Sequence, residues 1–288
     1  MEKKKYRSKS VAERISLVLI YAILIIISLV WLIPFVLLVV FSFRGESVGI
    51  SADYIFPKQW SFKNYITLFT ETQFLTWYGN TLLVSVVVTV VQTVIVLMTS
   101  YALSRLRFKL RKPLMNIMLI LGMFPGFLSM TAVYFVLKEI NLTQNLFGLM
   151  LVYSASSAMQ YYICKGFFDT IPKSLDEAAR IDGASRHTVF VKIILPLAKP
   201  IIIYTVLTAF IAPWGEYMFS SFIMLGDTDK YTVAVGMKSW LDNAMLMSQG
   251  YFAVFCAAAV VVSIPITALF IWLQRYYVGG VTGGSVKG

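Results

Sequence analysis

Six long apolar runs constrain this chain more than any other feature of its sequence. Five of them contain no Asp, Glu, Lys or Arg, and the sixth contains only Glu216. The runs span 15–43, 78–104, 113–137, 140–164, 200–226 and 243–274. Each is longer than the ~20 residues that a helix needs to cross a hydrocarbon core of ~30 Å. Because no alternation with a period of two occurs, the runs predict transmembrane helices rather than the strands of a barrel.

The overall composition also indicates a membrane protein. Hydrophobic residues make up 58% of the 288 positions and charged residues 14%, whereas soluble domains lie nearer a half and a quarter. The mean hydropathy of +0.76 is too apolar for a chain with water on all sides. The first run is longer than the apolar part of a cleaved signal peptide. We therefore expect it to remain as the first span, kinked at Pro34.

Basic residues are distributed unevenly between the segments that separate the runs. Nineteen of the 25 Lys and Arg residues lie in 1–14, 105–112, 165–199 and 275–288. Since cytoplasmic segments are enriched in Lys and Arg, these segments are predicted to lie inside. The protein is thus expected to be a multi-pass protein of the inner (cytoplasmic) membrane with both termini cytoplasmic. The net charge of +11 is then explained by the topology, and no nucleic acid is expected as a partner. The basic segment 105–112 should contact anionic lipid headgroups.

Several kinds of chemistry find no support in the sequence. Cys164 and Cys256 lie in or beside apolar runs, which suggests packing, and His187 has no companion ligand. No Gly-x4-Gly-Lys-Ser/Thr loop and no hydrolase motif occurs. We therefore predict no enzymatic activity, no cofactor and no metal for this chain.

Three features predict local structure in and around the first spans. The third run contains Gly122-Met-Phe-Pro125-Gly126, where the proline should break the helix and the glycines should permit close contact with another helix. The short loop 138–145 predicts an antiparallel hairpin. The segment 44–77 has apolar residues at helical spacing, which predicts either an interfacial helix or an ordered loop that caps the bundle. These residues are Phe62, Tyr65, Ile66 and Phe69.

The longest predicted inner segment reads as two short helices joined by a turn. Ser174 and Glu177 fit a capping box that opens the first helix, and Gly183 fits its C-terminal stop. Ser185 can cap the second helix, after which Pro196 leads into the fifth span.

The side chains of the first short helix suit contact with another protein. Ala178 and Ala179 are small enough to let a partner approach closely. The charged residues Glu177, Arg180 and Asp182 could form ion pairs across such a contact.

The pattern Glu-Ala-Ala-x3-Gly-x9-Ile-x-Leu-Pro in this segment resembles the signature loop of ABC importer permeases. The resemblance implies an all-α, polytopic membrane fold with six transmembrane helices. It further implies that the loop, about 172–196, forms a cytoplasmic coupling helix that docks in a cleft of a separate ATPase, which would bind ATP and Mg. The implied ATPase-coupling residues are Glu177, Ala178, Ala179, Arg180, Asp182, Gly183, Ile193, Leu195 and Pro196.

Short motifs elsewhere resemble the six-span subunit of maltose/maltodextrin-type permeases. They are Asn64-Tyr65, Trp77-x-x-Asn80-Thr81, Met123-Phe124-Pro125, Tyr231-Thr-x-Ala-Val-Gly-Met237 and the glycine-rich end from Gly280. The resemblance implies a second, different permease subunit, an ATPase dimer and an extracytoplasmic sugar-binding protein as partners, with an oligosaccharide as cargo. It also implies that the tail contacts the ATPase, through Gly284, Val286, Lys287 and Gly288. The first outer loop looks shorter than in some relatives, which puts any contact made there in doubt.

Glu216 is the only charged residue inside a run and lies in Pro213-Trp214-Gly215-Glu216-Tyr217. An intramembrane carboxylate is a functional candidate. It could line a sugar path, pair with the partner permease, or form a structural hydrogen bond inside the bundle. Trp214 and Tyr217 could stack on a sugar or serve as interfacial anchors.

The expected organisation has four parts. They are a cytoplasmic N-terminus at 1–14, a first transmembrane helix and outer loop at 15–77, a conserved permease domain at 78–275 and a cytoplasmic tail at 276–288. The alternatives for function are a permease for another oligosaccharide or glycoside and an ion-coupled secondary transporter. A membrane-embedded enzyme would need more titratable groups in the bundle than Glu216 alone.

Overall fold

The computed structural model describes residues 11–46, 55–224 and 226–283, and their regular structure is helical apart from one isolated bridge between Arg44 and Trp60. The first half contains α1 (Val11–Ser42), α2 (Lys63–Thr70), α3 (Phe74–Arg105), α4 (Arg111–Met123), α5 (Gly126–Glu139), α6 (Leu146–Ala155), α7 (Ala158–Thr170) and α8 (Lys173–Ile181). The second half contains α9 (Arg186–Val189), the π-helical turn η1 (Phe190–Ile194), α10 (Leu195–Leu197), α11 (Lys199–Gly215), α12 (Met218–Met224), the short turn η2 (Thr228–Lys230), α13 (Val233–Asp242), α14 (Ala244–Ser248) and α15 (Tyr251–Gly283).

Three unbroken helices in the described part of the chain are long and apolar enough to cross a membrane. They are Ile15–Ser42, Phe74–Arg105 and Tyr251–Gln274. Two further spans result if each strongly bent helix pair crosses as one unit, which gives three to five candidates by length and composition. The prediction of an all-helical, multi-pass fold is confirmed at this level.

The fourth apolar run does not form the single helix that we predicted. Residues 140–145 are loop, with left-handed backbone at Asn141 and Gln144, and the helical part of the run breaks between α6 and α7. At this break the Ser157 hydroxyl donates to the Ser154 carbonyl oxygen and accepts from the Gln92 amide. Such local side-chain bonds to the backbone compete with the helical ladder.

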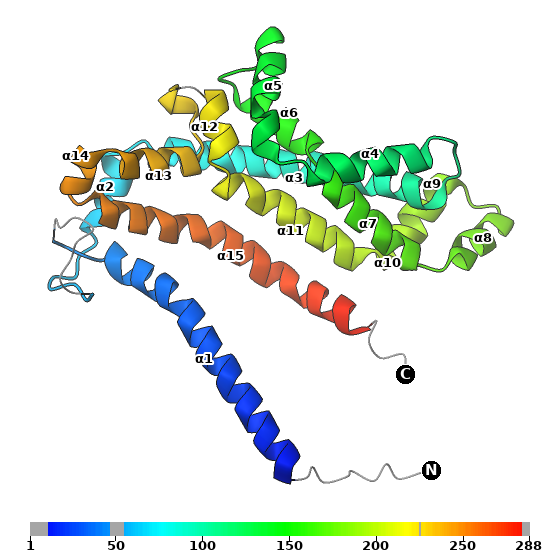
Figure 1. Cartoon of the computed structure of the whole chain (residues 1–288), viewed down its shortest axis with the longest axis horizontal. Coiled ribbons are helices and arrows are strands. Elements are labelled where there is room, and N and C mark those ends of the chain that lie inside the picture. Colours follow the sequence, from blue (N-terminus) through cyan, green and yellow to red (C-terminus); the bar gives the residue numbers. More distant parts are fainter. Residues whose placement is uncertain (1–10, 47–54, 225, 284–288) are drawn as a thin grey trace.

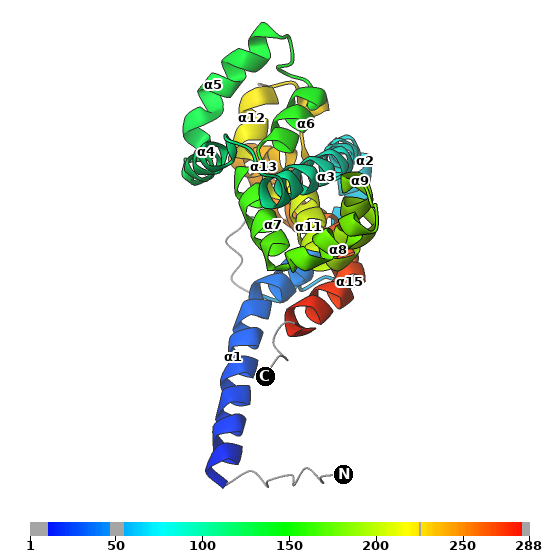
Figure 2. The ribbon, with the colours of Figure 1, turned by 90° about the vertical axis from the view of Figure 1, so that its right-hand side faces the viewer.

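Pro125 divides the third apolar run, as its sequence predicts. The helix axes of α4 and α5 differ by 104° across it. Gly122 allows α4 to lie close to α7, since a Cβ at this position would be 3.3 Å from the Met159 nitrogen, whereas Gly126 has no such neighbour. The α5–α6 hairpin and α12 share a small apolar cluster that includes Leu137, and Figure 2 shows these three helices projecting together from the bundle.

The centre of the molecule is a bundle in which α3 packs against α6, α7 and α11, and α15 packs against α11 (Figure 1). One apolar cluster lies at the end where α13 and α14 gather, and it contains Trp77, Trp214 and Trp240. Gly236 is required there because a Cβ would overlap the Trp77 ring at 2.0 Å. A second cluster lies at the opposite end of α3 and joins it to α7 and to the segment that follows α8.

The first helix is almost entirely exposed. Its most apolar window has no buried residue, and only its C-terminal end packs against α15, where the Phe41 and Phe252 rings meet at 6.1 Å. The N-terminal half diverges from the bundle in Figure 1. Of the two alternatives left open for 44–77, part of the segment forms a helix, α2, and the Asn64 amide ties it to the end of α1 by donating to the Ser42 and Arg44 carbonyl oxygens.

The last helix extends beyond the last apolar run into the glycine-rich C-terminal region. Helix α15 continues through Gly279 and Gly280 as far as Gly283, so the last span extends without interruption into the predicted tail. The residues expected to contact an ATPase, Gly284 to Gly288, lie outside the described part of the chain.

Candidate functional site

The helix α8 begins two residues earlier than the capping-box prediction requires. Pro172 occupies the N-cap position, with extended backbone and no side-chain cap bond, so Ser174 lies inside the first turn. The capping-box assignment is therefore wrong. A proline at this position sets the helix entry through its fixed φ, and Asp176 in the first turn and Arg180 in the last turn complement the helix dipole.

Gly183 ends α8 in a Schellman motif, as its position in the sequence predicts. Its φ is +83°, a left-handed conformation that glycine adopts without strain. The Gly183 N–H donates to the Arg180 carbonyl oxygen at 3.1 Å, and the Ala184 N–H donates to that of Ala179 at 2.9 Å. A Cβ at Gly183 would meet nothing within 4 Å, so the requirement for glycine is conformational rather than steric.

The second helix of the segment starts where we predicted. The Ser185 hydroxyl accepts from the Thr188 N–H at 3.2 Å and caps α9. The helix continues through η1 to α10, where the missing N–H of Pro196 interrupts the bonding ladder. An axis change of 81° at Ala198 then leads into α11. Ile194 is buried, whereas Ile193 and Leu195 are half-buried and Pro196 is exposed.

The outer face of α8 is open to solvent. Glu177, Ala178, Arg180 and Asp182 are exposed, and none of these three charged side chains forms an ion pair with another described residue. Ile181 is 86% exposed, a large value for an apolar side chain. The predicted coupling residues Glu177 to Gly183 thus form one continuous surface with free charges and an apolar tip.

The inner face of α8 is held to α3 by an ion pair that the sequence analysis missed. The Arg105 Nε lies 2.9 Å from an Asp176 carboxylate oxygen, and the two side chains are 4% and 14% exposed. Arg105 also donates to the Ile171 carbonyl oxygen at 2.9 Å. The prediction that 105–112 contacts lipid headgroups therefore fails for Arg105. Its partner lies 71 residues away by residue number, and no local pattern reveals a pairing at that distance.

A second polar contact supports the same junction. The Ser104 hydroxyl donates to Asp169, whose carboxylate also pairs with Lys165 on α7. Partial burial raises the pKa of Asp169, but the bonds from Lys165 and Ser104 outweigh burial and hold this pKa below its usual value. The end of α3 is thus fixed to both α7 and α8 through charged or polar groups.

Glu216 lies in the short connection between α11 and α12. Its carboxylate accepts from the backbone N–H groups of Phe219 and Ser220 at 2.7 and 2.9 Å and so caps α12. It also accepts from the Tyr153 hydroxyl at 2.6 Å. Of the roles left open for this residue, the structural hydrogen bond is the one formed here. Glu216 also borders a cavity of 220 Å³ that is lined in part by Gln92 and Gln160.

The two aromatic neighbours of Glu216 differ in exposure. Trp214 is 4% exposed and packs between Tyr78 and Phe210, with ring centroids 5.2 and 5.9 Å away. Its ring is covered, so the expected stacking on a sugar is not supported. Tyr217 is exposed and borders a separate 570 Å³ depression with Tyr231 and Asn243.

Metal binding finds no support in the described residues. They contain no group of three or more His, Cys, Asp and Glu side chains that could hold an ion. Cys164 and Cys256 are buried and unpaired by disulfide.

Comparisons with known proteins all match this chain to membrane components of transport systems. Residues 95–282 match the family described as binding-protein-dependent transport system inner membrane component. The chain is 36% identical to the maltodextrin transport system permease protein MdxG of Bacillus subtilis, over 97% of this chain and 99% of that protein. It is 34% identical to the galactooligosaccharides transport system permease protein GanQ of the same organism, over 96% and 98%.

A second maltodextrin relative and a solved structure extend the comparison. The maltodextrin permease MalD of Streptococcus pneumoniae is 36% identical over 96% of this chain and 97% of its own length. The fold is similar to a chain in the crystal structure of a bacterial ABC transporter involved in the import of the acidic polysaccharide alginate. That match has a TM-score of 0.77 at 24% identity and covers 94% of this chain and 99% of the other.

Proposed function

Because this chain belongs to the binding-protein-dependent transport system inner membrane component family, we propose that it is a permease subunit of an ABC importer for maltodextrin-type oligosaccharides. The chain is an inner-membrane permease subunit of a binding-protein-dependent ABC importer for sugars. Such a subunit has no catalytic activity and binds no cofactor, and ATP hydrolysis occurs on a separate ATPase. The observation that supports the maltodextrin assignment is 36% identity to MdxG across 97% of the chain.

The coupling proposal concerns the surface of α8. Two ATPase subunits would close on ATP and press on Glu177 to Gly183, and the movement would pass to the bundle through the contacts of α8 with α3. The free charges and the exposed Ile181 side chain support docking in a cleft of another protein. Ile193, Leu195 and Pro196 would set the position of the second helix beside it. The tail residues Gly284, Val286, Lys287 and Gly288 are proposed to hold the same ATPase pair.

The membrane arrangement is proposed to have six spans with both termini in the cytoplasm. Helices α1, α3 and α15 would each cross once. The bent pair α4 and α5, the pair α6 and α7, and α11 with α12 would supply the remaining three. The placement of nineteen Lys and Arg residues in the four proposed inner segments supports this orientation.

The remaining proposed partners are a second, different permease, an extracytoplasmic sugar-binding protein and the oligosaccharide itself. Glu216 and Tyr217 are proposed to border the substrate path, since each lines a depression in the described structure. A galactooligosaccharide is the second candidate cargo, because GanQ is 34% identical over nearly the full length.

Uptake by cells distinguishes the two cargoes. A strain lacking this chain, and the same strain with the chain restored, would be given labelled maltotriose or a labelled galactooligosaccharide. We expect the restored strain to accumulate maltotriose and the deletion strain to lose that uptake. Restored uptake of the galactooligosaccharide alone would contradict the maltodextrin assignment while leaving the permease assignment intact.

A further inference from the structure

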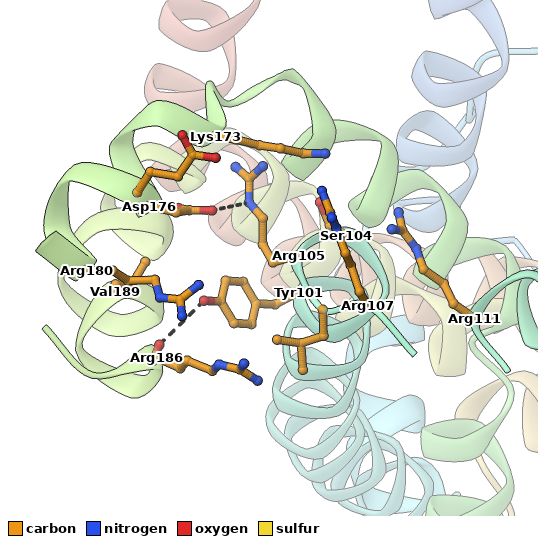
Figure 3. Close-up of a pocket in the computed structure, with 12 residues that line it drawn as sticks. Tyr101, Ser104, Arg105, Arg107, Arg111, Lys173, Asp176, Arg180, Arg186 and Val189 are labelled. Atoms are coloured by element: carbon orange, nitrogen blue, oxygen red, sulfur yellow. Dashed lines mark hydrogen bonds and ion pairs between the residues drawn. The ribbon is translucent and has the colours of Figure 1, made fainter. Parts of the chain in front are cut away.

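A cavity of 360 Å³ separates the end of α3 from α8 and α9 (Figure 3). Six cationic side chains and two carboxylates, Asp176 and Glu177, line it together with other residues. The cationic side chains come from the end of α3, the loop after it, the start of α4, α8 and α9. They are Arg105, Arg107, Arg111, Lys173, Arg180 and Arg186.

Most of this positive charge is uncompensated. Of the two carboxylates, Asp176 is already engaged by Arg105. Within the described residues, Arg107, Lys173 and Arg186 form no ion pair. Like charges held around one cavity repel each other. An anion bound among them would be attracted to each cation and would offset that repulsion.

Arg105 supplies an unsatisfied donor inside the cavity. Its side chain is only 4% exposed, and its Nη1 has no hydrogen-bond partner among the described residues. Its Nη2 donates to the Ile171 carbonyl oxygen, whereas its Nε lies 2.9 Å from an Asp176 carboxylate oxygen as an ion pair without hydrogen-bond geometry. Buried polar groups are nearly always hydrogen-bonded, and Asp176 Oδ1 is likewise unpaired, so the Arg105–Asp176 junction retains buried polar atoms without a partner at the edge of this cavity. In Figure 3 the side chains of Lys173 and Arg107 lie beside Arg105, and those of Arg180 and Arg186 lie on the other side of the Tyr101 ring.

We propose that this cavity binds a phosphate-bearing anion, with its oxygens accepting from cationic side chains that line it, Arg107 and Arg186 among them. The planar fork of arginine matches the geometry of phosphate oxygens. The cavity has room for roughly a dozen water molecules at ~30 Å³ each, which accommodates a phosphate group with part of its hydration shell.

The phosphate could belong to a lipid headgroup or to a soluble anion. The exposed side chains of Phe108 and Leu110 lie in the loop directly after α3, at the end of an apolar helix long enough to span a membrane. A headgroup phosphate would therefore lie within reach of the cavity. In either case the anion would bridge α3 to α8 and α9, and would favour the arrangement of α8 seen here.

The test measures anion binding to the complete transporter complex, purified in an uncharged detergent without nucleotide. One arm titrates radiolabelled inorganic phosphate. The other uses native mass spectrometry to count phosphatidylglycerol molecules retained after incubation with mixed micelles of phosphatidylglycerol and the detergent. The variant Arg107→Gln/Arg186→Gln removes two exposed cavity charges and leaves the Arg105–Asp176 pair in place.

The matched control is Lys109→Gln/Lys112→Gln, which removes the same charge from two exposed residues outside the cavity, one in the loop after α3 and one at the start of α4. We expect saturable binding of one probe or both in the wild type and the control, and at least about tenfold weaker binding in the arginine variant, equivalent to ~1.4 kcal/mol. The arm that gives binding identifies the source of the phosphate. Because Arg107 and Arg186 are exposed, both variants should assemble, and Arg186→Gln alone should give a smaller loss in the same direction.

Three results would overturn the proposal. The first is that neither probe binds the wild type. The second is that the arginine variant binds the probe as tightly as the wild type. The third is that the lysine control loses as much affinity as the arginine variant. An acidic side chain of the ATPase that fills the cavity would produce the first of these. None of the measurements depends on which sugar is transported.

Discussion

At the scale of single residues, parts of the loop at 172–196 were predictable from the sequence. These are the positions where a single residue determines the local backbone geometry. Gly183 and Ser185 were identified correctly from the sequence because a C-terminal glycine and an N-cap serine act on their immediate neighbours. The capping box failed because the N-cap is Pro172, two positions before Ser174. The Arg105–Asp176 pair was not predictable, since it depends on how two distant segments meet.

Replacing Gly183 tests whether the turn after α8 is needed for coupling. Gly183→Val places a β-branched residue at φ +83°, which costs about 1–2 kcal/mol and favours a different path for the turn. We expect transport and sugar-stimulated ATP hydrolysis to collapse while the protein still inserts. Gly183→Asn is the matched control, because asparagine tolerates left-handed backbone and should retain much of the activity. Stimulation that survives in Gly183→Val would count against the coupling role.

At the scale of elements, the sequence predicted helices well and their continuity poorly. Pro125 broke the third run as expected. The break between α6 and α7 was not foreseen, and the polar contact at the break, from the Gln92 amide to the Ser157 hydroxyl, comes from another helix. The last apolar run ends at residue 274, and nothing in that run indicates that α15 continues through Gly279 and Gly280 to Gly283.

The attachment of α8 to α3 can be tested through its ion pair. Asp176→Asn leaves Arg105 buried without its carboxylate, and such losses cost about 3–5 kcal/mol. We expect a clear fall in the unfolding temperature of the purified protein and weaker coupling of ATP hydrolysis to transport. Asp182→Asn removes the same charge from an exposed residue at the end of α8 and should leave the unfolding temperature unchanged, because Asp182 forms no ion pair with another described residue. Equal unfolding temperatures for the two variants would show that the pair contributes little.

At the scale of the whole molecule, the elements gather at two ends. Residues 105–112, α8 and α9 lie near one end of the bundle, and α2, α13 and α14 lie at the other (Figure 1). This separation agrees with the charge distribution, which places the first group inside. The exposed α1 and the open face of α8 are surfaces expected of one subunit of a larger assembly.

Cysteine labelling from outside the cell tests this orientation. Cysteines introduced at Ile50 and Lys230 should react with an impermeant reagent in intact cells. Cysteines at Ser8 and Ser285 should react only after the membrane is opened, because both termini are proposed to be cytoplasmic. The reverse labelling pattern would contradict the topology, and the buried Cys164 and Cys256 would first be replaced to remove background.

The most direct test of an ATP-driven sugar permease is uptake by proteoliposomes. They would contain this chain, its partner permease and the ATPase, with the binding protein and labelled maltotriose outside. The account predicts uptake that requires this chain and enclosed ATP, and that persists when ionophores abolish all ion gradients. Uptake without ATP that is driven by an ion gradient would contradict it and would instead support a secondary transporter.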